Sequence, residues 1–181
     1  MDMILPLIEY GHLDFGENKV QEAVDKWSEI KEKKPNIQLH MIGGLQKNKV
    51  KFAVKLFDYI HSVDSERLAK KISDEQIKIN KNIKIFIQVN IGNEDQKSGI
   101  NKSGIKKLVD YCKKLKLNVI GLMCIPPSNI DPMNYFTEMK NLNKTFGFTE
   151  LSMGMSGDYL DAIKANSTYL RIGSSIFGQR F

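Results

Sequence analysis

The chain has 181 residues, enough for one substantial core and too few for two comfortable domains, so we expect a single domain over residues 1–181. Hydrophobic residues make up 41% of the chain and charged residues 27%, which is ordinary for a globular protein and argues against a disordered one. The net charge is +6, but the Lys residues are scattered over expected helices without interleaved aromatics. This pattern favours a solvated lysine-rich surface over a nucleic-acid-binding one.

Cysteine usage and hydropathy indicate the compartment. Cys112 and Cys124 are far apart and form no Cys-x-x-Cys pair, which argues against a disulfide framework or a zinc site and suits a reducing environment. No apolar run approaches the roughly 20 residues that a membrane span needs. Residues 1–6 lack the basic flank of a signal peptide. We therefore expect a cytoplasmic protein without a membrane or nucleic-acid partner.

Short apolar runs alternate with amphipathic helical patterns along the chain. In chain order, the apolar runs predict strands at residues 13–16, 38–42, 59–63, 83–90, 118–123, 150–153 and 168–172. The helical patterns lie at residues 3–10, 20–30, 48–56, 68–77, 105–112, 131–142 and 159–165. Asp64 or Ser65 is expected to cap the helix after the third strand, and Asp131 with Pro132 to start the helix after the fifth.

Strict alternation of apolar strands with helices predicts a parallel sheet, and hence an α/β fold. A closed (β/α)₈ TIM barrel needs eight strands and typically about 250 residues. Seven strands are counted here, and the chain begins with a helix. We therefore expect a barrel of about seven strands that lacks its first strand. An open, doubly wound sheet of seven strands is the alternative.

Two consecutive strands end in flexible turns rich in hydrogen-bond donors. The segment Leu151–Asp158 covers the end of the sixth strand and the turn after it, and Gly173 with Ser174 and Ser175 follows the seventh strand. In (β/α)₈ barrels the last two strand–helix loops commonly bind a phosphate group, so we expect these turns to form a phosphate-binding site. The alternative is that both are ordinary strand-to-helix turns. Arg171 lies inside the last strand, where its guanidinium must meet an acceptor or a negative charge.

The other strand ends carry amide, hydroxyl and imidazole groups but no convincing catalytic set. No close pair of carboxylates suited to acid–base work is visible. His12, His40 and His61 lack metal-ligand spacing, and we expect His40 and His61 to be hydrogen-bonded residues that line the barrel. The residues therefore predict neither an enzyme nor a metal site.

Eight short segments in chain order form a specific pattern: Phe15–Ala23, His40–Lys49, His61–Ser65, Gln88–Asn90, Lys97–Gly99, Gly121–Met123, Ser152–Ser156 and Arg171–Gly178. With these segments the chain resembles the pyridoxal phosphate homeostasis protein family over essentially its whole length. The resemblance implies a barrel like the N-terminal domain of bacterial alanine racemase. It also implies a monomer that binds and buffers pyridoxal 5′-phosphate (PLP) without catalysis.

The resemblance also implies roles for the site residues. Gly173 and Ser174, together with Ser156, would hold the phosphate, and Ser152 belongs to the same matching segment. Arg171 matches the arginine that faces the pyridine nitrogen in the related racemase, where a cation disfavours protonation of that nitrogen. Asn18 would line the pocket near the ring.

The chain departs from the family in one respect. Family members bind the aldehyde as a Schiff base to a lysine near the end of the first strand, in a Val-Ser-Lys-type motif, and no lysine here matches it. We expect weak, reversible PLP binding and two unpaired sheet edges. Two other functions stay open: an alanine-racemase-like enzyme, which would need a second β domain and the lysine base, and a binding protein for another phosphorylated ligand.

Overall fold

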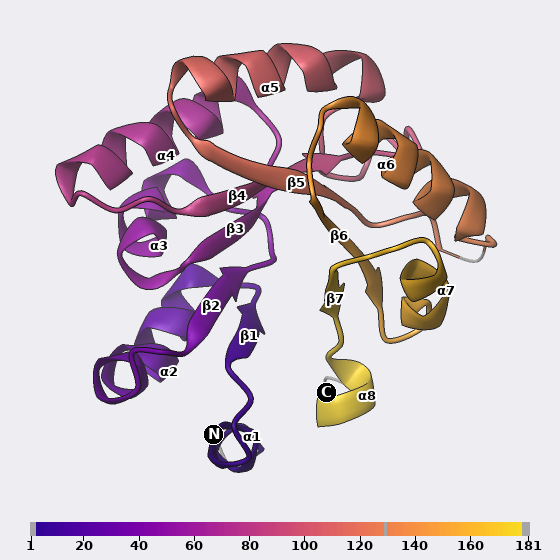
Figure 1. Ribbon diagram of the computed structural model, residues 1–181. Helices are drawn as coiled ribbons and strands as arrows, with labels where there is room; N and C mark the ends of the chain where they lie inside the picture. The colour runs from indigo at the N-terminus through magenta and orange to yellow at the C-terminus, as the bar shows by residue number, and fades with distance from the viewer. Residues whose placement is uncertain (1–2, 129, 179–181) are drawn as a thin grey trace.

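The computed structural model describes residues 3–128 and 130–178. Its centre is a parallel sheet of seven strands whose spatial order is the sequence order, β1 to β7 (Figure 1). The seven strands are β1 (Asp14–Glu17), β2 (Gln38–Met41), β3 (Tyr59–Val63), β4 (Lys84–Val89), β5 (Asn118–Cys124), β6 (Glu150–Met155) and β7 (Tyr169–Arg171). The prediction of a TIM-like barrel is confirmed, and the doubly wound alternative is wrong because the strand order has no reversal point.

Helices alternate with the strands and cover the outer face of the sheet. The helices are α1 (Leu5–Glu9), α2 (Val20–Lys33), α3 (Val50–Leu56), α4 (Glu66–Lys78), α5 (Ile105–Lys114), α6 (Met133–Thr145), α7 (Tyr159–Lys164) and α8 (Ser174–Phe177), with single 3₁₀ turns η1 (Lys47–Lys49) and η2 (Lys102–Gly104). All seven predicted helices are present. The single-turn helix α8, directly after β7, was not predicted because its Gly-Ser-Ser start has the composition of a loop.

Polar side chains predicted at two helix starts accept hydrogen bonds from the first backbone amides. The Ser65 hydroxyl accepts a hydrogen bond from Leu68 N at the start of α4, so Ser65 is the cap. The carboxylate of Asp131 accepts from Met133 N at 3.0 Å, just before α6. Among the described residues, none of the helices combines the length and the apolar character that crossing a bilayer requires.

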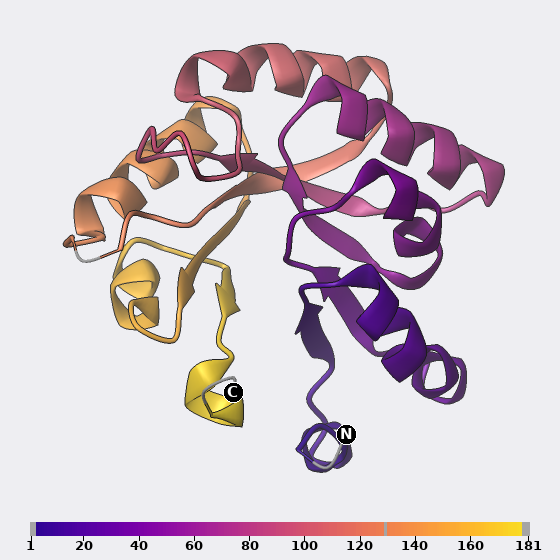
Figure 2. The same ribbon diagram turned by 180° about the vertical axis from the view of Figure 1, so that it is seen from behind.

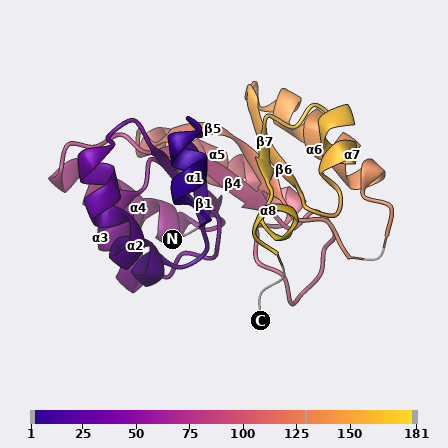
Figure 3. The ribbon, with the colours of Figure 1, turned by 90° about the horizontal axis from the view of Figure 1, so that it is seen from below.

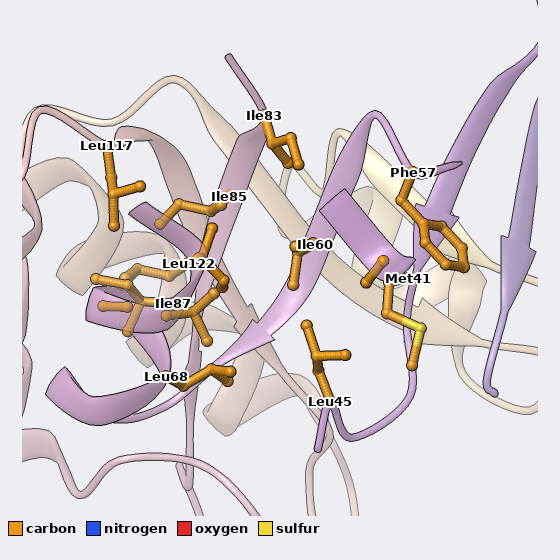
Figure 4. Packing of buried hydrophobic residues seen from close by; sticks show 14 of the residues in the cluster. Met41, Leu45, Phe57, Ile60, Leu68, Ile83, Ile85, Ile87, Leu117 and Leu122 are labelled. Atoms are coloured by element: carbon orange, nitrogen blue, oxygen red, sulfur yellow. The ribbon is translucent and has the colours of Figure 1, made fainter. Parts of the chain in front are cut away.

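The main hydrophobic core lies between the sheet and the surrounding helices. Trp27 of α2, Phe57 after α3 and Phe136 of α6 are fully buried there, next to the outward-facing aliphatic side chains of the strands. Figure 4 shows part of this layer, in which Ile60, Ile85 and other strand residues point toward the helices. Burial of this apolar surface stabilises the ring of strands that carries the site.

The ring of strands is not closed by pairing within the described residues. β1 pairs only with β2, and β7 pairs only with β6. Figures 2 and 3 show β1 and β7 on the two sides of the remaining opening. The expectation of two unpaired sheet edges is therefore confirmed for the described residues.

Candidate functional site

The turns after β6 and β7 meet at the carboxyl end of the sheet, as the sequence predicted. The hydroxyl oxygen of Ser156 accepts hydrogen bonds from Gly173 N at 3.2 Å and from Ser175 N at 3.3 Å. Both bonds use lone pairs of the oxygen, so the Ser156 O–H is left to donate. Hydroxyl and amide donors from two loops are thus gathered at one place, which we call the cup (residues 156 and 173–175).

A bulge in β6 aims the first of these turns at the second. Ser152 pairs with Tyr169 and Met155 pairs with Arg171, so β6 uses one residue more than β7 over the same stretch. Gly154 lies at the bulge with a φ of +92°, and a Cβ there would stand 2.5 Å from the Cβ of Ala162. Only glycine tolerates both the positive φ and the close helix, so Gly154 fixes the path of the loop.

Arg171, the last residue of β7, turns its guanidinium into the barrel. Its Nη1 donates to Ser152 Oγ at 2.6 Å, and its Nη2 donates to the carbonyl oxygen of Cys124 at 2.8 Å. Burial lowers the pKa of Arg171, but a guanidinium stays protonated in proteins. The prediction that this cation meets acceptors is confirmed, and Arg171 stands two residues before the cup in the chain.

Two histidines continue the polar contacts through the barrel. His61 Nδ1 lies 2.9 Å from Ser152 Oγ, and His61 Nε2 lies 3.0 Å from His40 Nδ1. His40 Nε2 lies 3.0 Å from a carboxylate oxygen of Asp14. Both histidines are buried, so the prediction that they are hydrogen-bonded residues lining the barrel is confirmed.

Burial also sets the protonation states around Arg171. It lowers the pKa of His40 and lowers that of His61 well below the ordinary value, and the neighbouring His40 and Arg171 lower the pKa of His61 further. At neutral pH both imidazoles are therefore uncharged. Burial raises the pKa of the Cys124 thiol to about 12, so this sulfur is not a nucleophile near neutral pH.

Aromatic rings hold the imidazoles in place. His40 stacks on Tyr59 with ring centroids 4.1 Å apart, and His61 stacks on Phe86 at 4.3 Å. The ring of Tyr169 stands edge-on to Phe86 at 5.2 Å. Together with Met123 these side chains form a small second core inside the barrel.

The loop after β4 folds back along its own strand at the same rim. Asn90 N donates to Ile100 O at 3.0 Å, and the Asn90 side chain exchanges hydrogen bonds with the backbone of Glu94. Lys97 Nζ donates to Pro126 O at 3.1 Å and pairs with Glu94. These contacts order the loop, and they use the amide of Asn90 internally.

The predicted site residues do not all come together. Ser156, Gly173 and Ser174 share the cup, whereas Ser152 lies deeper, fully buried under the Arg171 guanidinium. Asn18 is exposed at the end of β1, across the opening from β7, and its carbonyl oxygen would be only 2.2 Å from a Cβ at Gly43. The cofactor-binding role of all these residues stays a prediction.

Some groups at the strand ends differ from the sequence expectation. Glu17, the last residue of β1, points outward, where its carboxylate accepts from Trp27 Nε1 and Lys26 Nζ, each at 2.7 Å. Asp14 and the carbonyl of Cys124 were not anticipated. A signal for Asp14 was its alternation with the buried Phe15, which places Asp14 on the inner face of β1. Among the described residues, no group of three or more His, Cys, Asp or Glu side chains is arranged to hold a metal ion.

Comparisons with known proteins agree with this geometry. The family described as "Alanine racemase, N-terminal domain" matches residues 1–180. A pyridoxal phosphate homeostasis protein of Vibrio alginolyticus is 37% identical over 99% of this chain and 82% of its own, and one of Vibrio cholerae is 37% identical over 99% and 81%. The solved structure of PipY from Synechococcus elongatus PCC7942 with PLP bound superposes with a TM-score of 0.91 at 30% identity, covering 98% of this chain and 87% of PipY.

Proposed function

Because the chain belongs to the pyridoxal phosphate homeostasis proteins, a family with the fold of the alanine racemase N-terminal domain, we propose that it binds PLP reversibly and buffers it in the cytoplasm without catalysing a reaction. The observation that carries this proposal is the cup next to Arg171. Ser156 Oγ stands within 3.3 Å of the amide nitrogens of Gly173 and Ser175. Arg171 precedes Gly173 by two residues in the chain. Phosphate and a flat polar ring match these two neighbouring features.

The cup would hold the phosphate. The Ser156 hydroxyl would donate to the phosphate, and a phosphate oxygen would replace Ser156 Oγ as the acceptor for the amides of Gly173 and Ser175. Ser174 would add its hydroxyl, which is exposed at the same turn. The bulge at Gly154 supports this role because it brings the two loops together without a ligand.

Arg171 would face the pyridine ring. When bound, PLP supplies an aldehyde and a ring that withdraws electrons strongly only when its nitrogen is protonated. A fixed cation beside that nitrogen disfavours the protonated form, because like charges repel. Ser152 and the carbonyl of Cys124 occupy two donors of the guanidinium and so fix its plane.

The remaining predicted residues take supporting roles in this proposal. Ser152 would act through Arg171 rather than touch the cofactor, because its oxygen is fully buried between Arg171 and His61. Asn18 would close the ring side of the pocket from β1. We further propose that residues 1–181 act as one monomeric domain of this barrel, of which residues 1, 2, 129 and 179–181 lie outside the described part.

Equilibrium dialysis against PLP, pyridoxal, pyridoxine 5′-phosphate and glycerol 3-phosphate tests the proposal. We expect PLP and pyridoxine 5′-phosphate to be retained, and the other two to bind much more weakly, since each lacks either the phosphate or the ring. Equal retention of glycerol 3-phosphate would favour a binding protein for another phosphorylated ligand. Failure of PLP to bind at all would overturn the proposal.

Covalent attachment and turnover are tested separately. Borohydride treatment of this 181-residue chain with PLP, followed by peptide mass spectrometry, should give no adduct concentrated on one lysine, because none matches the family motif. Incubation with L-alanine and PLP should produce no D-alanine. A single stoichiometric lysine adduct would contradict reversible, non-covalent binding, and measurable racemisation would contradict the non-catalytic role.

A further inference from the structure

A continuous chain of hydrogen bonds crosses the barrel from one end of the sheet to the other. It begins at Arg171, at the carboxyl end of β7, and finishes at Asp14, the first residue of β1. The contacts are Arg171 Nη1 to Ser152 Oγ at 2.6 Å, Ser152 Oγ to His61 Nδ1 at 2.9 Å, His61 Nε2 to His40 Nδ1 at 3.0 Å, and His40 Nε2 to Asp14 Oδ1 at 3.0 Å.

The direction of every bond follows from the Asp14 end. An ionised carboxylate only accepts, so His40 Nε2 carries the proton and His40 Nδ1, in a neutral ring, must accept. His61 Nε2 therefore donates to His40, and His61 Nδ1 accepts from the Ser152 hydroxyl. All bonds donate toward Asp14, and both histidines are Nε2–H tautomers.

The Arg171 end does not impose this direction by itself. The guanidinium can donate to Ser152 Oγ in both arrangements, but it meets two free lone pairs only when the serine hydroxyl donates to His61; in the reverse arrangement one lone pair accepts from His61. Without an acceptor-only partner at the far end, both tautomers of His40 and His61 would satisfy the inner bonds. The carboxylate of Asp14 is thus the group that selects one arrangement.

The chain is buried along its length and exposed at Asp14. The side chain of Asp14 is 58% exposed, whereas that of His40 is 6% exposed and the residues His61 and Ser152 are 1% and 0% exposed. Tyr59 and Phe86 stack on the two imidazoles and restrict rotation of the rings. Replacing the exposed carboxylate would therefore change which histidine nitrogens donate and which accept, while the packed rings keep their positions.

We propose that Asp14, His40 and His61 are positioning residues that fix the Ser152 hydroxyl and, through it, the orientation of the Arg171 guanidinium. The inference rests on the proposed function in one respect, because it makes PLP affinity depend on a carboxylate at the opposite end of the barrel from the cup. The order of the bonds is a property of the ligand-free protein and can be measured without PLP.

The test replaces Asp14 by Asn, whose amide both donates and accepts and so removes the selection. Asp25→Asn is the matched control, an identical change at an exposed carboxylate of α2 that accepts a hydrogen bond from Gln21 Nε2. In the full chain, side-chain ¹⁵N shifts of histidine report the tautomers, and ¹H–¹⁵N spectra of arginine report how firmly the Arg171 guanidinium is held. Arg171→Lys identifies its signal.

We expect His40 and His61 to be Nε2–H tautomers in the wild type and in Asp25→Asn, and to become tautomer mixtures in Asp14→Asn. The Arg171 signals should broaden only in Asp14→Asn. The PLP dissociation constant of this variant should rise about fivefold, which is at the low end of the affinity changes seen between coupled sites. Unchanged histidine or arginine spectra in Asp14→Asn would overturn the inference. So would altered spectra with unchanged PLP affinity. If the wild type binds no PLP, the proposed function fails, while the spectra still decide whether Asp14 orients Arg171.

Discussion

The two faces of the sheet are packed by opposite chemistries. The outer face meets the helices through one continuous apolar layer that includes Trp27, Phe57 and Phe136. The inner face holds a small aromatic cluster and the hydrogen-bonded residues from Asp14 to Arg171. Stability and ligand chemistry are therefore divided between the two faces: the outer layer keeps the strands together, and the interior positions Arg171 before the cup.

The largest effect is expected from an outer-layer cavity. Phe136 is fully buried, so Phe136→Ala should lower the free energy of unfolding by about 3–5 kcal/mol. PLP affinity, measured where the variant is still folded, should be unchanged. Phe52→Ala is the matched control because that ring is 47% exposed, and it should cost at most about 0.5 kcal/mol. A selective loss of PLP affinity in Phe136→Ala would break the division between the faces.

The interior should make stability depend on pH. His40 and His61 have pKa values below 6.5 when folded, so between those values and 6.5 the unfolded chain binds more protons. The free energy of unfolding therefore has its highest value above pH 6.5. It falls as the pH drops below 6.5, by up to about 1.4 kcal/mol per pH unit for each histidine.

Charged groups near the two imidazoles also affect their pKa values. Burial is the largest effect on the pKa of both rings; Asp14 opposes it at His40, whereas His40 and Arg171 add to it at His61. The more distant charges on His40 are Asp58, which raises its pKa, and Lys31, which lowers it. Urea unfolding between pH 5 and 7.5 measures the slope, and His61→Leu should reduce it by removing one of the two protons. A slope that is the same in His61→Leu would show that the interior does not carry the effect.

A smaller and more local effect is expected at the cup. Ser156→Ala removes one donor and loosens the start of α8, so the dissociation constants of PLP and pyridoxine 5′-phosphate should both rise about tenfold, as for one hydrogen bond to a charged group. The histidine spectra should not change. Ser28→Ala, the same substitution on α2, should leave binding as it is. Unaltered affinity in Ser156→Ala would remove the cup from the binding site.

The smallest effect is expected at the two cysteines of the outer layer, whose thiols should not be alkylated in the folded protein. Cys112 and Cys124 are fully buried, and burial raises the pKa of each thiol to about 12. Iodoacetamide at pH 8 should therefore alkylate neither residue in the folded protein and both after unfolding in urea. Rapid labelling of Cys124 in the folded state would show that the layer beneath the Arg171 contact is open to solvent.

Much of the fold and part of the site followed from the sequence. The strand 84–89 and its neighbours are apolar enough to be recognised from the sequence. The turns after β6 and β7 belong to consecutive strand–helix units, so parallel pairing places the turn that holds Ser156 next to the turn that holds Gly173. By contrast, Ser152 was grouped with Ser156, and only the bulge at Gly154 separated them, because one extra residue changes which face a side chain occupies.

Local patterns in the chain therefore determined the alternation of strands and helices, the parallel sheet and the pairing of the last two turns, because each depends on residues close together or on adjacent units. The tertiary structure alone decided what lies inside the barrel. His61 and Ser152 are 91 residues apart, and they meet because the curved sheet turns the inner faces of β3 and β6 toward each other. No local periodicity encodes that meeting, and so the path from Arg171 to Asp14 appeared only when the strands were placed in space.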